Sequence, residues 1–310
     1  MKHKQTGRRI KDCASDRALY GVVNALLALM MLLVAYPLLN ILSSSFSSPR
    51  AVSTGRVVLL PVEFSLLGYQ TVFAHRLIGI AYRNTIFYSL AGTLINLTMV
   101  LTCAYPLSRR DFPLRSPLMI ACLITMYFSG GLIPTYIMVK NLGLVNTRWV
   151  LVLMGGLSVY NVIVTRVYFT SNIPEALYEA ARIDGASELR IFGQLALPLS
   201  GPIVAVIALY YAVGHWNDYF TALIYATKKD YQPLSLVLRR LLIQNEAAYL
   251  GTMSDPNATE EMLAMALQRT YTAAAMKYSL VFISSAPMLI AYPFVQKFFV
   301  KGMMIGSLKG

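Results

Sequence analysis

The segment Pro174–Pro198 reads PEALYEAARIDGASELRIFGQLALP, and this charged stretch lies between two long apolar runs. Its first proline suits the start of a helix, where a missing N–H costs little, and Glu175 places negative charge near the positive end of the helix dipole. Gly185 most easily takes the left-handed conformation that ends a helix, and Ser187 can cap a second helix that must stop before the final proline. The stretch therefore predicts a helix, a sharp bend and a second helix.

The same stretch carries too much charge to cross a bilayer. Charged side chains recur along both expected helices, at Glu175, Glu179, Arg182, Asp184, Glu188 and Arg190. Ala180 and Ala181 have almost no side chain, so another protein's backbone could approach that face closely. We therefore expect a water-exposed docking segment here and no active site.

The spacing of this stretch resembles the cytoplasmic motif of the membrane-spanning subunits of bacterial ABC importers. The shared pattern is Glu-Ala-Ala at residues 179–181, then Gly185, then Leu195 and a closing Leu-Pro at residues 197–198. Leu195 stands where that family usually has Ile. The longer strings EAARIDGAS and LPLSGP resemble the carbohydrate-importer branch, within the maltose-type permease family.

In that family the loop inserts into a cleft of an ATPase subunit and transmits its closure. The resemblance implies a cytoplasmic coupling loop at residues 170–198, which meets the ATPase through the stretch from Glu179 to Pro198. It assigns the coupling role to five residues: Glu179, Ala180, Ala181, Asp184 and Gly185. An ordinary solvated helical hairpin between two membrane spans is the alternative.

The composition is that of a membrane protein. Hydrophobic residues make up 56% of the 310 residues and charged residues only 13%, whereas soluble domains carry about 25% charged residues. The mean hydropathy is +0.56. The formal net charge of +13 could suggest nucleic acid, but the basic residues are dispersed among apolar runs and form no recognisable binding module. Anionic membrane lipids are the better match.

A helical span needs about 20 apolar residues, and the chain offers six such runs. They are Leu19–Leu42, Thr85–Leu107, Leu118–Val139, Trp149–Phe169, Leu199–Ala226 and Ser279–Phe299. The sequence thus predicts an all-α membrane protein with six transmembrane helices. The resemblance implies the type I ABC-importer permease fold, as one permease domain at residues 19–310 after a basic N-terminus at residues 1–18.

Basic residues in short loops predict the orientation, because Lys and Arg are retained on the cytoplasmic side. The first 17 residues are basic, and so is the loop that contains Arg109, Arg110 and Arg115. Both fall inside if the N-terminus is cytoplasmic, and six spans return the C-terminus to the same side. We therefore expect a multi-pass protein of the bacterial cell membrane, with the Glu179 loop in the cytosol and an outward loop at residues 227–278.

The outward loop contains LSLVLRRLLIQ at residues 234–244, which fits an amphipathic helix at the membrane surface or against a partner. In the resembled family such outward loops meet an extracytoplasmic solute-binding protein. A surface helix without a partner is the alternative.

The fifth apolar run contains an unusual polar group, His215-Trp216-Asn217-Asp218. Polar residues inside a span are costly unless they face protein or water. Trp216, Asn217 and Asp218 could line the substrate path, since an aromatic face can stack on a sugar ring and oxygens can bond its hydroxyls. Alternatively, the group makes hydrogen bonds between helices that fix this span in the bundle.

The third run contains Ser129-Gly130-Gly131 and then Pro134, which together should weaken or kink a helix. Close helix packing through small residues is the alternative. The surrounding string FSGGLIPTYIMVKNLGLVNTRWVLVL resembles the branch that imports complex oligosaccharides, including uronate-containing ones.

The end of the chain, YPFVQKFFVKGMMIGSLKG, resembles the tail of the maltose-type permease subunit. The resemblance implies that a cytoplasmic tail at residues 300–310, with Gly306, Lys309 and Gly310, lies between two ATPases. The alternative is a basic flank that anchors the last helix.

Chemistry-bearing motifs are missing from the sequence. The three Cys and three His residues are scattered, and no Walker A loop, nucleophile elbow or helical zinc motif is present. We therefore expect no cofactor and no enzymatic activity in this chain. The resemblance places ATP and Mg²⁺ on a partner ATPase.

Together these features predict the permease subunit of an ATP-driven oligosaccharide importer that forms half of the translocation pathway. The implied partners are a second homologous permease, two ATPase subunits, a solute-binding protein and membrane lipids, with no nucleic acid. A proton-coupled sugar transporter that uses Asp218 and His215 is the alternative. Its expected inverted repeats with paired broken spans are not visible.

Overall fold

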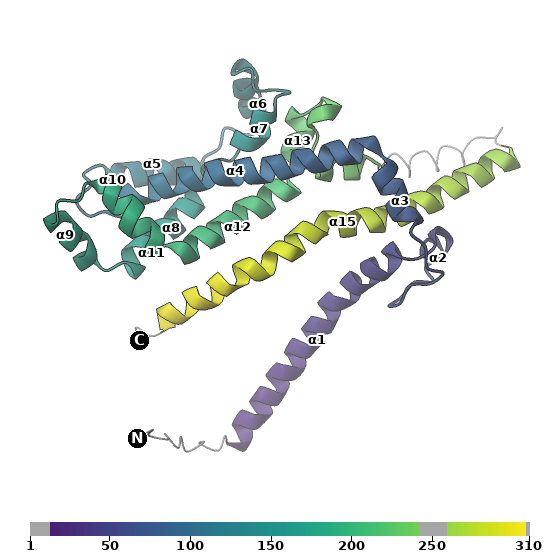
Figure 1. Ribbon diagram of the computed structural model, residues 1–310, viewed down its shortest axis with the longest axis horizontal. Coiled ribbons are helices and arrows are strands. Elements are labelled where there is room, and N and C mark those ends of the chain that lie inside the picture. The colour runs from purple at the N-terminus through teal and green to yellow at the C-terminus, as the bar shows by residue number, and fades with distance from the viewer. Residues whose placement is uncertain (1–12, 242, 244–258, 308–310) are drawn as a thin grey trace. The chain divides into compact units, whose positions relative to one another are not determined.

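The computed structural model describes residues 13–241, 243 and 259–307, and this part of the chain is mostly helical (Figure 1). The fold class predicted from the sequence, an all-α protein, is confirmed. The helices are α1 (Ala14–Ser45), α2 (Pro49–Ser53), α3 (Leu67–Ala74), α4 (Arg76–Ser108), α5 (Arg115–Tyr127), α6 (Leu132–Asn141), α7 (Arg148–Leu153), α8 (Val159–Asn172), α9 (Glu175–Ile183), α10 (Glu188–Ile191), η1 (Phe192–Ala196), α11 (Leu197–Leu199), α12 (Gly201–Asn217), α13 (Phe220–Tyr225), η2 (Lys229–Tyr231) and α15 (Glu260–Ser307).

The chain divides into two compact units, residues 1–70 with 258–282 and residues 71–257 with 283–310. In the first unit, the end of α1 packs on the early part of α15. Ser279 Oγ donates to the Ser45 carbonyl at 3.2 Å, and Tyr69 Oη donates to Ser45 Oγ at 2.8 Å. The apolar side chains along α1 are exposed. A long apolar helix of this kind is stable in lipid or against other helices, because water would disfavour it.

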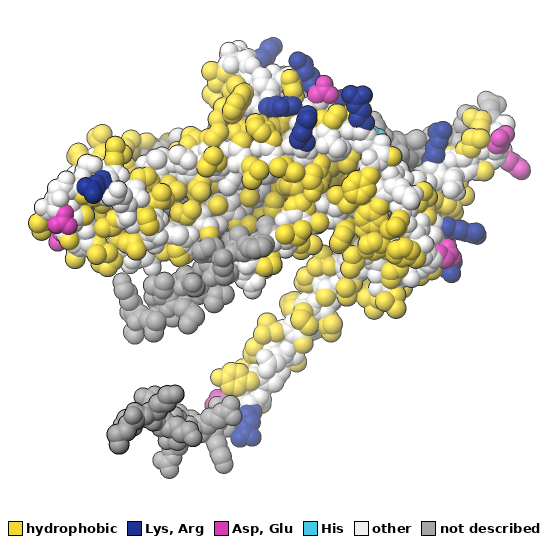
Figure 2. Space-filling view, viewed as in Figure 1, with side chains coloured by type: hydrophobic (Ala, Val, Ile, Leu, Met, Phe, Trp, Pro, Cys, Tyr) yellow, Lys and Arg dark blue, Asp and Glu magenta, His cyan; other side chains and the backbone are white. Residues whose placement is uncertain are grey.

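In the second unit, α4 packs along α12 and α8 (Figure 1). The core of this unit is apolar and aromatic, with Tyr105, Phe169, Tyr178 and Ile207 almost fully buried. Hydrophobic side chains also cover most of the outer face over α4, whereas Lys and Arg gather near α6, α7 and α13 (Figure 2). The distribution fits a bundle whose sides meet lipid.

Three helical stretches of the described chain are long and apolar enough to cross a membrane: Ser15–Ser45, Arg76–Ser108 and Glu260–Ile290. Two bent pairs are apolar enough together. They are Arg115–Tyr127 with Leu132–Asn141, bent by 113°, and Glu188–Leu199 with Gly201–Asn217, bent by 82°. The described residues therefore give up to five candidate spans, where the sequence predicts six.

The predicted third span, Leu118–Val139, is a broken helix. Helix α5 ends at Tyr127 and α6 begins at Leu132, on either side of the Ser-Gly-Gly sequence. The prediction that this sequence weakens the helix is confirmed.

The predicted fourth span, Trp149–Phe169, is wrong as a single helix. The chain leaves helical geometry between α7 and α8, over residues 154–158, and Gly155 has a φ of +69°. Two consecutive glycines disfavour a helix, and Ser158 then starts α8 by accepting a hydrogen bond from the Asn161 N–H. Counting apolar residues alone does not register such a break.

The predicted fifth span, Leu199–Ala226, is also interrupted. Helix α12 covers 17 residues, or about 25 Å, which is shorter than the roughly 30 Å hydrocarbon layer. Asp218 is extended, and its Oδ1 accepts from the Thr221 N–H at 3.1 Å, which starts a new turn at α13. The side chain of Asp218 thus competes with continuation of α12.

The predicted sixth span, Ser279–Phe299, lies inside the much longer helix α15. No Gly or Pro occurs between Glu260 and Ala286, and Ala, Leu, Met and Glu dominate the first turns, so the helix extends back into the predicted outward loop. Earlier in that loop, the predicted amphipathic helix is present over residues 234–241. Its residues 242 and 244 lie outside the described chain.

The predicted C-terminal tail is helical as far as it is described. Helix α15 includes Gly306 and ends at Ser307, and Lys309 and Gly310 lie outside the described residues, as does the basic stretch 1–12.

Candidate functional site

The predicted helix, bend and second helix are present as α9 and α10, beyond the Ser108 end of α4 (Figure 1). Gly185 has a φ of +77°. Its N–H bonds to the Arg182 carbonyl at 2.9 Å, and the Ala186 N–H bonds to the Ala181 carbonyl at 3.0 Å. These two bonds form a Schellman motif, which ends α9 by satisfying its last carbonyls. We call residues 175–199 the elbow.

The second helix of the elbow does not stop before Pro198, contrary to the prediction. Ser187 caps α10 as expected, but the chain stays helical through η1 and α11 and turns only at Ser200. In η1 the Leu197 N–H bonds five residues back, to the Phe192 carbonyl. This wider π-helical turn moves the preceding carbonyls away from the position where the Pro198 ring would strike them in an α-helix.

Two apolar side chains stand uncovered at the bend of the elbow, Ile183 at 86% exposure and Leu189 at 83%. Four of the five residues assigned to ATPase coupling surround them and are also exposed, whereas Ala181 packs against the chain's own core. We call this exposed face the elbow tip, formed by Glu179, Ala180, Ile183, Asp184, Gly185 and Leu189. An apolar pair on an otherwise charged surface is typical of a protein-binding face.

Arg109 fixes the first helix of the elbow to the end of α4. Its guanidinium forms an ion pair with Glu175 and lies 3.6 Å from the centre of the Tyr178 ring. The Arg109 side chain is only 7% exposed, so this charge depends on its partners. Burial raises the pKa of Tyr178, and the nearby Arg109 charge opposes that rise.

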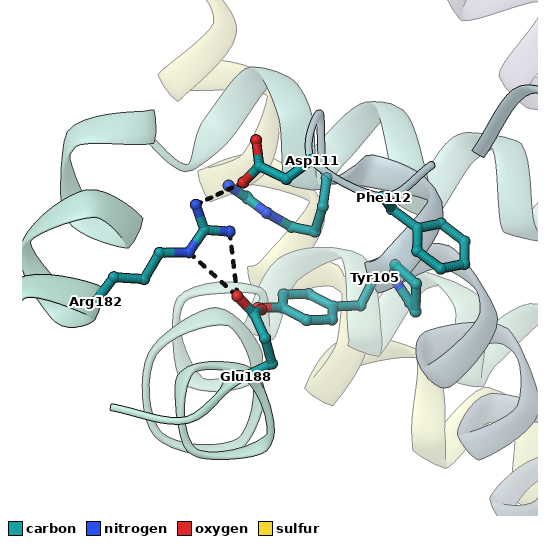
Figure 3. A pocket seen from close by; sticks show the side chains of 7 residues that line it. Tyr105, Asp111, Phe112, Arg182 and Glu188 are labelled. Atoms are coloured by element: carbon teal, nitrogen blue, oxygen red, sulfur yellow. Dashed lines mark hydrogen bonds and ion pairs between the residues drawn. The ribbon is translucent and has the colours of Figure 1, made fainter. Parts of the chain in front are cut away.

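Arg182 fixes the bend of the elbow to the loop between α4 and α5 (Figure 3). It contacts Asp111 at 2.6 Å and Glu188 at 3.1 Å, and Tyr105 Oη donates to Glu188 Oε2 at 3.0 Å. The hydrogen bond to Asp111 raises the pKa of Arg182 above its ordinary value. We call the five charged residues the inner clamp: Arg109, Asp111, Glu175, Arg182 and Glu188.

The inner clamp borders a cavity of about 240 Å³. It is lined by Tyr105, Pro106, Arg109, Asp111, Phe112, Arg182 and Glu188. Sequence reasoning used Arg109 only as a marker of orientation and did not single out Tyr105, Asp111 or Tyr178. The opposite charges of the two segments were the only available signal, because their pairing depends on the fold.

Of the four side chains in the polar group at the end of α12, two bond to other helices and two bond locally. Trp216 Nε1 donates to the Ser284 carbonyl of α15 at 2.8 Å. This is a hydrogen bond between helices, of the kind expected if the polar group fixes this span in the bundle. His215 is buried, and its Nε2 lies 2.8 Å from Asn96 Nδ2 on α4. Asn217 Nδ2 donates within its own helix, to the Val213 carbonyl at 3.0 Å.

Two cavities flank this polar group. One, of about 370 Å³, is lined by Trp216 and Asn217 together with α15 residues that include Ser285 and Tyr292. The other, of about 290 Å³, is lined by Asn217 and Asp218 but not by Trp216. The three residues assigned to the substrate path therefore do not share one cavity.

No cluster that could hold a metal ion is found in the described part of the chain, where three or more His, Cys, Asp or Glu side chains would have to meet.

Residues 13–304 match the family described as binding-protein-dependent transport system inner membrane component. The chain is 35% identical over 306 residues to the polygalacturonan/rhamnogalacturonan transport system permease protein YtcP of Bacillus subtilis (strain 168), covering 97% of this chain and 100% of that protein. It is 37% identical over 276 residues to protein LplC of the same organism, covering 88% and 89% of the two chains.

Among solved structures, the chain is similar to a chain in the crystal structure of a bacterial ABC transporter involved in the import of the acidic polysaccharide alginate. The TM-score is 0.79 at 33% sequence identity, and the match covers 94% of this chain and 99% of that chain.

Proposed function

The chain belongs to the family of inner membrane components of binding-protein-dependent transport systems, and from this premise we propose that it is the permease subunit of an ATP-driven importer of uronate-containing oligosaccharides. Membership makes it a transport component and not an enzyme. The substrate class is supported by the names of similar proteins, whose polygalacturonan, rhamnogalacturonan and alginate substrates are acidic polysaccharides. The observation that supports a coupling role for this chain is the exposed apolar pair of the elbow tip, Ile183 and Leu189.

The elbow tip would insert into a cleft of an ATPase subunit. Exposed Glu179, Ala180, Asp184 and Gly185 would contact the ATPase beside the apolar pair, whereas Ala181 would support the helix from the core side. The Schellman motif makes the bend rigid, and the inner clamp ties it to α4. Movement of the tip would then tilt α4 and, through the turn at Ser200, α12.

The proposal includes the remaining partners and the location. A second, homologous permease would complete the pathway, two ATPase subunits would carry ATP and Mg²⁺, and a solute-binding protein would deliver the substrate outside. The exposed apolar length of α1 fits lipid or the second permease. Both termini would lie in the cytoplasm of a bacterial cell, with one permease domain at residues 19–310 and an outward loop at residues 227–278.

Two further site assignments belong to this proposal. The substrate path would be bordered by Trp216 and Asn217 at the cavity of about 370 Å³, and by Asn217 and Asp218 at the cavity of about 290 Å³. The tail at residues 300–310, with Gly306, Lys309 and Gly310, would lie near the ATPases.

Family membership favours the binding-protein-dependent importer over the proton-coupled alternative built on Asp218 and His215. Uptake by cells that survives an uncoupler and stops when ATP is depleted is expected. Uptake that follows the proton gradient instead would reverse this choice.

The coupling role is tested with Gly185→Val in the complete importer, reconstituted in vesicles. A β-branched residue is strongly disfavoured at a φ of +77°, so the bend should deform. We expect ATP-driven oligosaccharide uptake to be lost while the ATPase subunits still hydrolyse ATP. The matched control is Gly193→Val, since Gly193 lies in the same elbow, has no positive φ and has open space around it. If Gly185→Val supports the same uptake as the active control Gly193→Val, the coupling role is refuted.

A further inference from the structure

Two breaks in the predicted spans meet around the cavity of about 290 Å³. One is the interruption between α7 and α8, and the other is the end of α12 at Asp218. The lining residues are Asn96, Met154, Gly155, Tyr211, Gly214, His215, Asn217 and Asp218. At membrane depth, non-helical backbone is tolerated where it is buried in protein or lines a polar cavity, and broken helices frequently frame transport sites.

Asn96 is the most buried polar residue of this cavity, at 1% exposure. Its Nδ2 lies 2.8 Å from His215 Nε2, but its Oδ1 has no hydrogen-bond partner in the described part of the chain. A buried amide oxygen without a partner is costly, so a water molecule or a ligand hydroxyl that donates to it would be favoured here.

The surrounding residues make room for the pair of Asn96 and His215. A Cβ on Gly92 would fall within the His215 imidazole, and one on Gly156 would lie 3.2 Å from Asn96 Oδ1. Tyr211 Oη accepts from the Ser158 N–H at 3.1 Å, which joins α12 to the break before α8. Small residues and a cross-link between helices thus hold the pair in one geometry at the cavity wall.

We propose that this cavity is a binding site for the hydroxyl groups of one sugar residue of the transported saccharide, with Asn96 and Asp218 as the main hydrogen-bonding groups. The proposal deepens the proposed function and rests on it. The volume is near the lower limit of small-molecule sites, about 300 Å³. The lining contains amide, imidazole, phenol and carboxylate groups but no Lys or Arg. Because the Asp218 carboxylate would repel a uronate carboxylate, the site fits hydroxyl groups, which can donate to it.

This assignment places the contact on α4 as well as α12, whereas the sequence pointed only to α12. It also separates the roles of two neighbours, since Trp216 faces the other cavity and bonds to α15.

The first test is uptake of trigalacturonate by the complete importer carrying Asn96→Leu, which keeps the side-chain size and removes both polar groups. We expect KM for uptake to rise about tenfold or more, because the substrate loses a hydrogen bond in the cavity. The control is Thr98→Val on the same helix, whose hydroxyl bonds only within α4, to the Leu94 carbonyl. A KM within about twofold of the parent for Asn96→Leu would overturn the proposal.

A second substitution separates hydroxyl from carboxylate recognition. Asp218→Asn keeps an oxygen that can accept from the Thr221 N–H, so α13 should still form. Hydroxyl recognition predicts a several-fold weaker apparent affinity for trigalacturonate. A stronger affinity would mean that a uronate carboxylate occupies the cavity and would overturn the assignment.

A labelling experiment covers the case in which Asn96→Leu fails to assemble. Gly214→Cys is introduced into an importer whose native cysteines are replaced by Ala, since a Cβ at Gly214 meets open space. We expect a water-soluble thiol reagent to label it, and trigalacturonate to slow labelling at least about threefold. No labelling, or labelling that trigalacturonate does not slow, would contradict the site.

Labelling can be measured without transport. If the parent importer shows no ATP-driven uptake, the proposed function is refuted, whereas the labelling result tests separately whether the saccharide binds in the cavity.

Discussion

The elbow and the cavity at the end of α12 handle polar groups in opposite ways. In the elbow, charged side chains pair with one another beside water and leave an apolar pair uncovered at the tip. In the cavity, a buried amide and imidazole pair with each other inside an apolar bundle and leave one oxygen unpaired. Each region thus leaves a group without the surroundings that suit it: an apolar pair in water at the elbow tip, and a buried polar oxygen in the apolar bundle.

The two regions would therefore obtain binding energy from different interactions. A partner protein would bury the uncovered Ile183 and Leu189 of the elbow tip, through the hydrophobic effect. A ligand of the cavity would instead supply a hydrogen bond to Asn96, in surroundings where an unmade bond is costly. Substitutions in the two regions should therefore differ in size and in their response to salt.

The largest effect is expected at Gly92 in the bundle. Gly92→Val would drive side-chain atoms into the His215 ring, and we expect a loss of about 3 kcal/mol, the upper end of the usual range for overpacking in a core. Thermal unfolding of the purified protein in detergent should show a clear loss of stability. Gly79→Val on the same helix, where open space surrounds the glycine, is the control and should change stability by about 0.5 kcal/mol or less, because valine is no worse a helix former than glycine.

The next effect is expected at the buried cation of the inner clamp. Arg109→Met removes the partner of Glu175 and the cation over the Tyr178 ring, and we expect a loss of about 2 kcal/mol, because Glu175 remains partly solvated. Arg110→Met, next to it but exposed, should change stability by less than about 0.5 kcal/mol. Equal effects of the two substitutions would show that Arg109 does not fix the elbow.

A smaller effect is expected at the solvated part of the clamp. Arg182 and Asp111 are 35% and 63% exposed, so a double-mutant cycle with Arg182→Gln and Asp111→Asn should give a coupling of about 0.5 kcal/mol. The coupling should fall further at high salt, because exposed charges are screened. A coupling energy above about 2 kcal/mol that does not change with salt concentration would show that this pair is not a solvated ion pair, and would contradict the account of the elbow.

The smallest effect is expected at Glu63, outside both regions. The Ser48 hydroxyl is the main cause that lowers the pKa of Glu63 below its ordinary 4.5, with Arg56 contributing. A carboxylate with a lowered pKa adds stability above its ordinary pKa and loses it as the pH falls through the folded-state value. The parent should therefore have a slightly higher Tm than Glu63→Gln at pH 6, and this difference should shrink as the pH falls below 4.5 and through the folded-state pKa. A difference that grows on acidification would give the opposite sign.

The elbow could be predicted from the sequence because its signals are local. Gly185 and Ser187 fix a helix end and a helix start within a few residues, and both positions are confirmed. The error at Pro198 arose because a π-helical turn removes the clash that a proline causes in an α-helix. That turn depends on the whole segment and has no distinct residue signal.

The bundle was less predictable because its decisive contacts join distant residues. Counts of apolar residues located the spans but not the breaks at Gly155 and Asp218, where short-range preferences interrupt an apolar run. Asn96 passed as an ordinary residue of the second span, since nothing nearby in the sequence connects it to His215. Arg109 likewise counted only as a basic loop residue.

The central claim is that the elbow tip contacts an ATPase, and crosslinking from Asp184 tests it most directly. An importer assembled with Asp184→Cys, with its native cysteines replaced, is treated with a short bifunctional thiol and amine crosslinker and separated on a denaturing gel. The account predicts a covalent adduct with the ATPase subunit whose yield changes when ATP is added. No adduct with the ATPase in any nucleotide state, from an importer that still transports, would contradict it.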